Sequence, residues 1–173
     1  LGDVYKRQVW FSLHGIRIKT APGRGGYVTN VFIADVIMHN VSMAIRITGN
    51  YDEHPDNNYD RNALPTIRNI TIQNIVGVDV DVAGILEGIE GDNFSSICIS
   101  NVSLSVASRH PWSCSLIEGY SNSVTPESCE QLSSDSGQVP VCYNGGGFSP
   151  VRIHTHSARA NRLLDFILKL ALV

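Results

Sequence analysis

The sequence has little positive charge. Its 13 lysines and arginines are outnumbered by 16 aspartates and glutamates, which gives the 173-residue chain a formal net charge of −3. It contains no stripe of basic residues interleaved with aromatic rings, and such a stripe is the usual electrostatic footprint of nucleic-acid binding. We therefore expect no nucleic-acid partner.

Long apolar runs are also missing. The longest candidate, Leu163–Val173, is too short to cross a bilayer and carries Asp165 and Lys169. No Gly-rich phosphate loop opens a helix, and the six histidines show no zinc-ligand constellation. We expect a monomer that binds no membrane, no metal and no cofactor.

Helical periodicity is scarce before residue 160, whereas Val and Ile dominate short segments that share one pattern. Asn30–Val36, Asn69–Ile75 and Ser96–Val102 align on this pattern, at offsets of 39 and 27 residues. These offsets are too long for a hairpin and suit stacked coils with loop insertions. The pattern favours an all-β parallel solenoid, with a hairpin sandwich as the alternative.

A second alignment brings GIRIKT, AIRITG and GILEGI into register. On strands, alternate side chains face opposite sides. The alignment therefore predicts an inward ladder and an outward ladder beside it: Ile18, Ile47 and Leu86, and Lys19, Thr48 and Glu87.

Two cations stand out in GIRIKT. Arg17 and Lys19 are two residues apart, so on a strand their side chains share one face at a spacing of roughly 7 Å. Lys19 is isolated in the body of the chain, because the other lysines, Lys6 and Lys169, lie near its ends. A guanidinium beside an ammonium is suited to binding a carboxylate or a phosphate. The alternative is two solvated charges on the polar face of a strand.

The segment Gly49–Pro65 is dense in Asn, Asp, Pro and Gly, which predicts a surface loop. Binding residues concentrate on such loops. Its Tyr51, His54 and Tyr59 offer ring surface and hydrogen bonds suited to a sugar. Alternatively, Tyr51 closes the end of its coil.

Four cysteines and four glycosylation sequons indicate a secreted protein. Cys114 and Cys129 flank a loop rich in Ser, Gly and Pro, and we expect a disulfide between them, with the partners of Cys98 and Cys142 left open. In a β-rich chain full of Asn, Ser and Thr, sequons also arise by chance. The candidate glycosylation sites are Asn40, Asn69, Asn93 and Asn101.

The chain divides by composition into four parts. We expect residues 1–8 to be a translated scar outside the fold, 9–108 to form the coils and 109–142 to form an irregular cap stapled by cysteines. Residues 143–173 change character again, and they are either a tail with a short amphipathic helix or read-through of untranslated sequence.

Several spaced motifs occur in one order, namely GIRIKTAPGRGGY, TGNY, HPDN, LEGIEGD, ICISNVSL, WSC and PESC. The segment from about Gly15 to Leu132 that contains them resembles the carboxyl-terminal part of plant polygalacturonase-like proteins. These are pectin-cleaving glycoside hydrolases built on a right-handed parallel β-helix. The resemblance implies a protein of the extracellular space or cell wall whose partner is an acidic polysaccharide, pectin or galacturonan. It also implies that Arg17 and Lys19 bind the carboxylate of a galacturonate unit, with Tyr51 in the same cleft.

The same resemblance limits the chemistry. The family hydrolyses α-1,4-linked galacturonan with inversion, using aspartates as general acid and base in Asn-Thr-Asp and Asp-Asp motifs that precede the RIK segment. Neither motif occurs in this chain, and His14 abuts the RIK segment instead of lying upstream in a Gly-His-Gly segment. Glu87 and the loop acids Asp52, Asp56 and Asp92 are explained more simply as solvated side chains.

We therefore expect a fragment that keeps part of the substrate cleft, lacks the catalytic aspartates and is inactive alone. The alternatives are a non-catalytic carbohydrate-binding or structural β-helix protein, and a hydrolase of another acidic polysaccharide such as rhamnogalacturonan.

Overall fold

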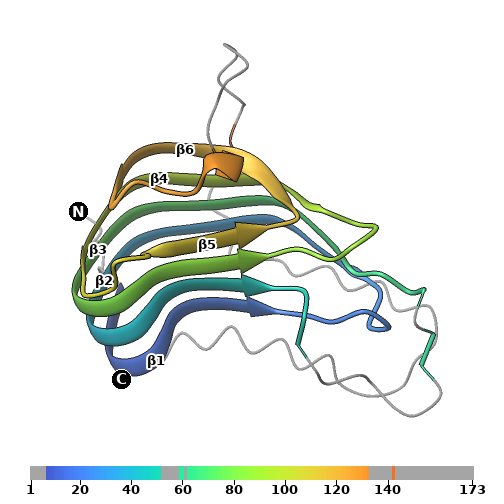
Figure 1. Ribbon diagram of the computed structural model, residues 1–173, viewed down its shortest axis with the longest axis horizontal. Coiled ribbons are helices and arrows are strands. Elements are labelled where there is room, and N and C mark those ends of the chain that lie inside the picture. The colour runs from blue at the N-terminus through green and yellow to red at the C-terminus, as the bar shows by residue number, and fades with distance from the viewer. Residues whose placement is uncertain (1–6, 52–58, 61, 133–141, 143–173) are drawn as a thin grey trace, which may run out of the picture.

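Figure 1 shows the protein as a computed structural model, which describes residues 7–51, 59, 60, 62–132 and 142. Strands account for most of these residues. The elements in chain order are β1 (Arg7–Lys19), β2 (Tyr27–Thr48), β3 (Thr66–Glu87), β4 (Phe94–Val106), β5 (Trp112–Ser115), β6 (Ile117–Thr125) and the 3-10 helix η1 (Glu130–Leu132).

All pairings between these strands are parallel, in the order β1-β2-β3-β4-β6 with β5 on β3. Val31 pairs with Ile70 and Ile70 with Ile97, which gives the 39- and 27-residue offsets expected from the sequence. Parallel neighbours cannot be joined by hairpins. The parallel β-helix is therefore confirmed, and the hairpin sandwich is wrong.

The long strands bend at residues with a left-handed backbone. In β2 these are Asn30, Asp35 and Asn40, at φ values of 59°, 60° and 53°. Short polar side chains tolerate this conformation better than other non-glycine residues. The bends turn each coil back on itself, so the strands form two faces with the core between them (Figure 1).

Equivalent bends in successive coils are linked by side-chain hydrogen bonds. The Nδ2 atom of Asn69 donates to Oδ1 of Asn30 at 3.0 Å. At the next bend, Asn74 donates to Asp35 at 3.0 Å and Asn101 donates to Asn74 at 2.8 Å. Asn74 thus joins three coils at one corner of the β-helix.

The core is built from stacked aliphatic rungs. Ile18, Ile47 and Leu86 pair in register and are 6%, 1% and 0% exposed, which confirms the inward ladder. The outward ladder is also in register, and Lys19 and Glu87 are partly exposed. Thr48 differs from this prediction, because it is fully buried and its hydroxyl donates to Glu87.

The strand pattern extends beyond the expected limits at both ends. β1 takes in Arg7 and Gln8, which pair with Val36 and Ile37 although residues 1–8 were expected outside the fold. The expected irregular cap contains β5 and β6, which add a strand to each face. These short strands bury few residues, so apolar alternation does not reveal them.

Two disulfides hold the carboxyl-terminal part. Cys114 is joined to Cys129, the pair expected from the sequence, with Cα atoms 6.2 Å apart. Cys98 is joined to Cys142, with Cα atoms 5.8 Å apart, which supplies the pairing that the sequence left open.

Residues 143–173, for which the sequence suggested either a tail with a short helix or read-through, lie outside the described residues. Within the described part of the chain, no helix has the length and apolar character needed to span a membrane.

Candidate substrate-binding site

The cationic pair lies at the carboxyl end of β1. Ile16 and Ile18 are 2% and 6% exposed, whereas Arg17 and Lys19 on the opposite face are partly exposed. The alternation inferred from GIRIKT therefore holds, because the apolar side chains enter the core and the cations remain outside it. This places two positive charges on one rigid strand.

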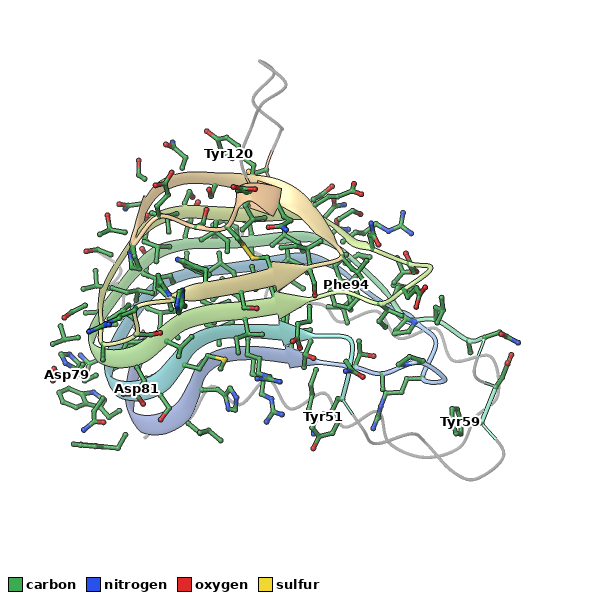
Figure 2. All side chains as sticks on the ribbon, in the orientation of Figure 1. Tyr51, Tyr59, Asp79, Asp81, Phe94 and Tyr120 are labelled. Carbon is green, nitrogen blue, oxygen red and sulfur yellow. A yellow bond between two sulfur atoms is a disulfide. The ribbon has the colours of Figure 1, made fainter. Side chains whose placement is uncertain are left out.

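Tyr51 lies against both cations. Its backbone N–H donates to the carbonyl of Thr20 at 3.1 Å, which fixes the residue beside the end of β1. The Nζ atom of Lys19 is 4.1 Å from the centroid of the Tyr51 ring, and the Cζ atom of Arg17 is 5.4 Å from it. Figure 2 shows the ring beyond β1, away from the core. The three residues selected from the sequence form one cluster held by cation–π contacts.

The cations of this cluster are not neutralised within the described part of the chain. No described carboxylate forms an ion pair with Arg17 or Lys19, and the buried Nε atom of Arg17 has no hydrogen-bond partner there. A buried donor without a partner carries a desolvation cost. Among the described residues, neither cation therefore has an acidic partner.

His14 lies on the same strand as the cluster, near Arg17 and also near Arg46 of β2. Its burial lowers the pKa of the imidazole below the usual 6.5, and the positive charges of Arg17 and Arg46 lower it further. The neutral form is therefore favoured. No substrate role was assigned to His14 from the sequence.

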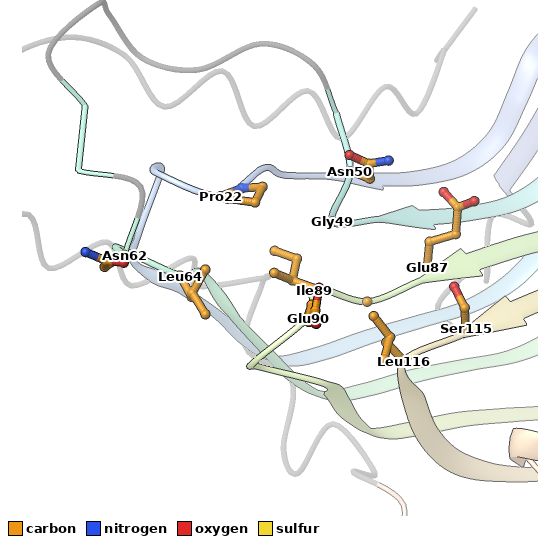
Figure 3. A pocket seen from close by; sticks show the side chains of 11 residues that line it. Pro22, Gly49, Asn50, Asn62, Leu64, Glu87, Ile89, Glu90, Ser115 and Leu116 are labelled. Atoms are coloured by element: carbon orange, nitrogen blue, oxygen red, sulfur yellow. The ribbon is translucent and has the colours of Figure 1, made fainter.

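A groove of about 790 Å³ lies at the ends of β2 and β3, where Asn50, the residue before Tyr51, and Glu87 line it (Figure 3). Thr48 and Glu87 follow Lys19 on successive rungs, and Ser115 of β5 follows Glu87. Thr48 donates to Oε2 of Glu87 at 3.1 Å and accepts the backbone N–H of Asn50 at 3.2 Å. Sequence reasoning placed Glu87 in this row but missed the groove, because β5 carries no clear strand signal.

The other candidate residues lie elsewhere or have other partners. Tyr59 packs against Gly23, away from Tyr51 (Figure 2). Asp92 accepts a hydrogen bond from the Thr66 hydroxyl at 3.0 Å, so its carboxylate has a structural role in joining two coils. Asp52, His54 and Asp56 lie outside the described residues. Among the described side chains no group of three His, Cys, Asp or Glu residues could hold a metal ion.

The four sequons lie on the outside of the described coils, in different settings. Asn40, Asn93 and Asn101 are exposed, and Asn69 is partly buried. The side-chain amides of Asn69 and Asn101 donate to Asn30 and Asn74, in the hydrogen bonds that link bends of successive coils. The amide of Asn93 donates to Glu118 at 3.4 Å. Glycosylation at these positions stays a prediction.

Residues 3–129 match the family model described as "Glycosyl hydrolases family 28". The chain belongs to glycosyl hydrolase family 28. A protein from Vitis vinifera, named "Probable polygalacturonase", is 45% identical over 121 residues. The alignment covers 68% of this chain and 25% of the relative, so this family 28 chain spans about a quarter of that protein's length. No solved structure matches it.

Proposed function

We propose that this chain is part of a secreted pectin-degrading hydrolase of the polygalacturonase type, and that Arg17, Lys19 and Tyr51 bind a galacturonate unit. Membership of family 28 and the likeness to the grapevine protein support the substrate class. The observation that carries the assignment is the Tyr51 ring against Lys19 at 4.1 Å and against Arg17 at 5.4 Å.

The chemistry of the cluster fits a sugar acid. The guanidinium of Arg17 donates in a planar fork that matches a carboxylate, and the ammonium of Lys19 adds a compact charge. The Tyr51 ring supplies an apolar face against which a pyranose ring packs. Because no described carboxylate pairs with the two cations, a uronate, which brings a counter-charge, suits the cluster better than a neutral sugar.

The cleavage step belongs to the longer enzyme. In an inverting hydrolase, one carboxylic acid protonates the leaving oxygen while a second carboxylate activates water, at a separation of roughly 6.5 to 9.5 Å. The Asn-Thr-Asp and Asp-Asp motifs expected to supply these groups are missing from this sequence. We infer that the chain is a carboxyl-terminal portion which binds galacturonan without hydrolysing it.

Two disulfides and four sequons support an extracellular or cell-wall location for the monomeric parent enzyme. Disulfides persist in oxidising compartments, and sequons are modified on the secretory route.

Calorimetric titration of the purified chain with oligogalacturonides tests the binding site. Arg17→Ala and Lys19→Ala should each weaken binding by about tenfold or more, because each removes a charge-assisted contact. Arg68→Ala is the matched control, since Arg68 is exposed on β3 outside the cluster. Equal affinity for a neutral oligosaccharide, or unchanged affinity in both variants, would contradict the proposal.

A reducing-end assay on polygalacturonate tests the inferred lack of catalysis. The chain should release no new reducing ends above a heat-treated sample. Sustained turnover would show that carboxylates within this chain cleave the bond.

A further inference from the structure

The groove beside the cationic cluster has the opposite electrostatic character. Among the described residues, its lining carries two carboxylates, Glu87 and Glu90, and no lysine or arginine. Its remaining surface combines apolar and neutral polar side chains, as Figure 3 shows: Pro22, Leu64, Ile89 and Leu116, with Asn50, Asn62 and Ser115. A ligand in this groove therefore meets negative charge and apolar surface.

The groove and the cluster lie in line along the β-helix. Lys19, Thr48 and Glu87 occupy consecutive rungs, so Glu87 is displaced from Lys19 by roughly 10 Å at the usual spacing between strands. A short oligosaccharide covers that distance. A chain with one unit on Lys19 and Tyr51 would place a neighbouring unit beside Glu87.

Glu87 is held in one orientation. The Thr48 hydroxyl donates to its Oε2 atom at 3.1 Å, and Thr48 itself is fully buried. No described group donates to Oε1 of Glu87, so this atom can accept hydrogen bonds from sugar hydroxyls. A free uronate at this position would bring a second carboxylate toward a fixed one, which is unfavourable for two like charges.

An uncharged pyranose avoids that repulsion. Its hydroxyls can donate to Glu87, and a methyl ester on its carboxyl group can pack against Ile89 and Leu116. We propose that this groove is a subsite for an uncharged sugar unit, methyl-esterified galacturonate in particular, next to the free galacturonate bound by Arg17, Lys19 and Tyr51. The site then selects partly esterified galacturonan, an assignment that rests on the proposed function.

Calorimetry with size-matched oligomers of the full chain tests this assignment. The ligands are unesterified oligogalacturonide, its partly methyl-esterified counterpart, and an oligomer that alternates galacturonate with rhamnose. The partly esterified oligomer should bind about three- to tenfold more tightly than the unesterified one, as expected for relief of one like-charge contact. The rhamnose-containing oligomer distinguishes a general preference for an uncharged ring from recognition of the ester itself.

Glu87→Gln removes the charge and keeps an oxygen that can accept from Thr48. The variant should bind the unesterified oligomer more tightly and lose most of the discrimination. Glu127→Gln is the control, because Glu127 is exposed and lies outside the groove.

The outcomes separate this inference from the proposed function. If Arg17→Ala weakens every oligomer while the wild type binds esterified and unesterified forms equally, the subsite is wrong and the uronate site stands. An unchanged preference in Glu87→Gln also overturns the subsite. If no acidic oligomer binds, both assignments fail.

Discussion

The Nζ atom of Lys19 lies 4.1 Å from the centre of the Tyr51 ring, although the two residues belong to successive coils. The ring is held there by the backbone hydrogen bond from Tyr51 to Thr20. Arg17 approaches the same ring at 5.4 Å. One aromatic side chain therefore contacts both cations, and its removal tests the cluster as a unit.

Tyr51→Ala should weaken oligogalacturonide binding by about tenfold, because both cations lose the ring that orients them and the sugar loses its apolar contact. Tyr51→Phe keeps the ring and should retain most of the affinity. Titration of both variants measures the difference. A loss in Tyr51→Phe equal to that in Tyr51→Ala would show that the hydroxyl, and not the ring, is the important group.

His14 should make stability depend on pH. Its folded pKa lies below 6.5 because of burial and the nearby Arg17 and Arg46, so protonation is disfavoured in the folded state. The unfolded chain takes up this proton first as pH falls. The contribution is therefore fully present above pH 6.5 and is lost progressively below it, toward the folded pKa.

Urea unfolding between about pH 7.5 and pH 5 checks this effect. The midpoint of the wild type should fall more over that interval than that of His14→Gln, which cannot titrate. A steeper fall in the variant would contradict the direction of the pKa shift.

Asn74 should contribute to stability through one corner of the β-helix. It donates to Asp35 at 3.0 Å, accepts from Asn101 at 2.8 Å and has a φ of 56°. Asn74→Ala should cost about 2 kcal/mol in the free energy of unfolding, because it removes two exposed hydrogen bonds and strains the backbone. Asn74→Gly loses the same bonds without the strain and should be less destabilising, by about 1 kcal/mol. If the two variants unfold at the same urea concentration, the backbone conformation is not a cost at this corner.

Gly49 lies between the buried Thr48 and Tyr51, and a side chain at this position should destabilise the fold. A Cβ atom at this position would overlap Ile89 and come within 2.9 Å of Cζ of Phe94. Gly49→Ala should destabilise the fold by about 1 to 3 kcal/mol and should also reduce oligogalacturonide binding, since the shift reaches Tyr51.

Gly26→Ala is the matched comparison for Gly49→Ala. Nothing lies within 4 Å of a Cβ built there, and the cost is limited to a positive φ of 75°. Urea unfolding and the oligogalacturonide titration compare the two variants. Equal stability of the two, or unchanged binding in Gly49→Ala, would show that close packing at Gly49 is not required.

The sequence by itself determined the rungs of the β-helix and the strand that carries the cations. Period-two alternation in GIRIKT sets Ile16 and Ile18 against Arg17 and Lys19, and repetition of that alternation aligns Ile18 with Ile47 and Leu86. This alternation can be read from the sequence because burial of every second side chain sets the register between parallel strands.

Tertiary structure alone decided what stands next to the cations. A backbone hydrogen bond to Thr20 holds Tyr51 beside the end of β1, where its ring meets Lys19. Ser115 of β5 and Leu116 after it contribute to the lining of the groove. Thr48 was expected outside and is buried, because its hydroxyl turns to Glu87 on the next rung. Loop closure and contacts between coils depend on residues far apart in the chain, and local alternation contains no information about them.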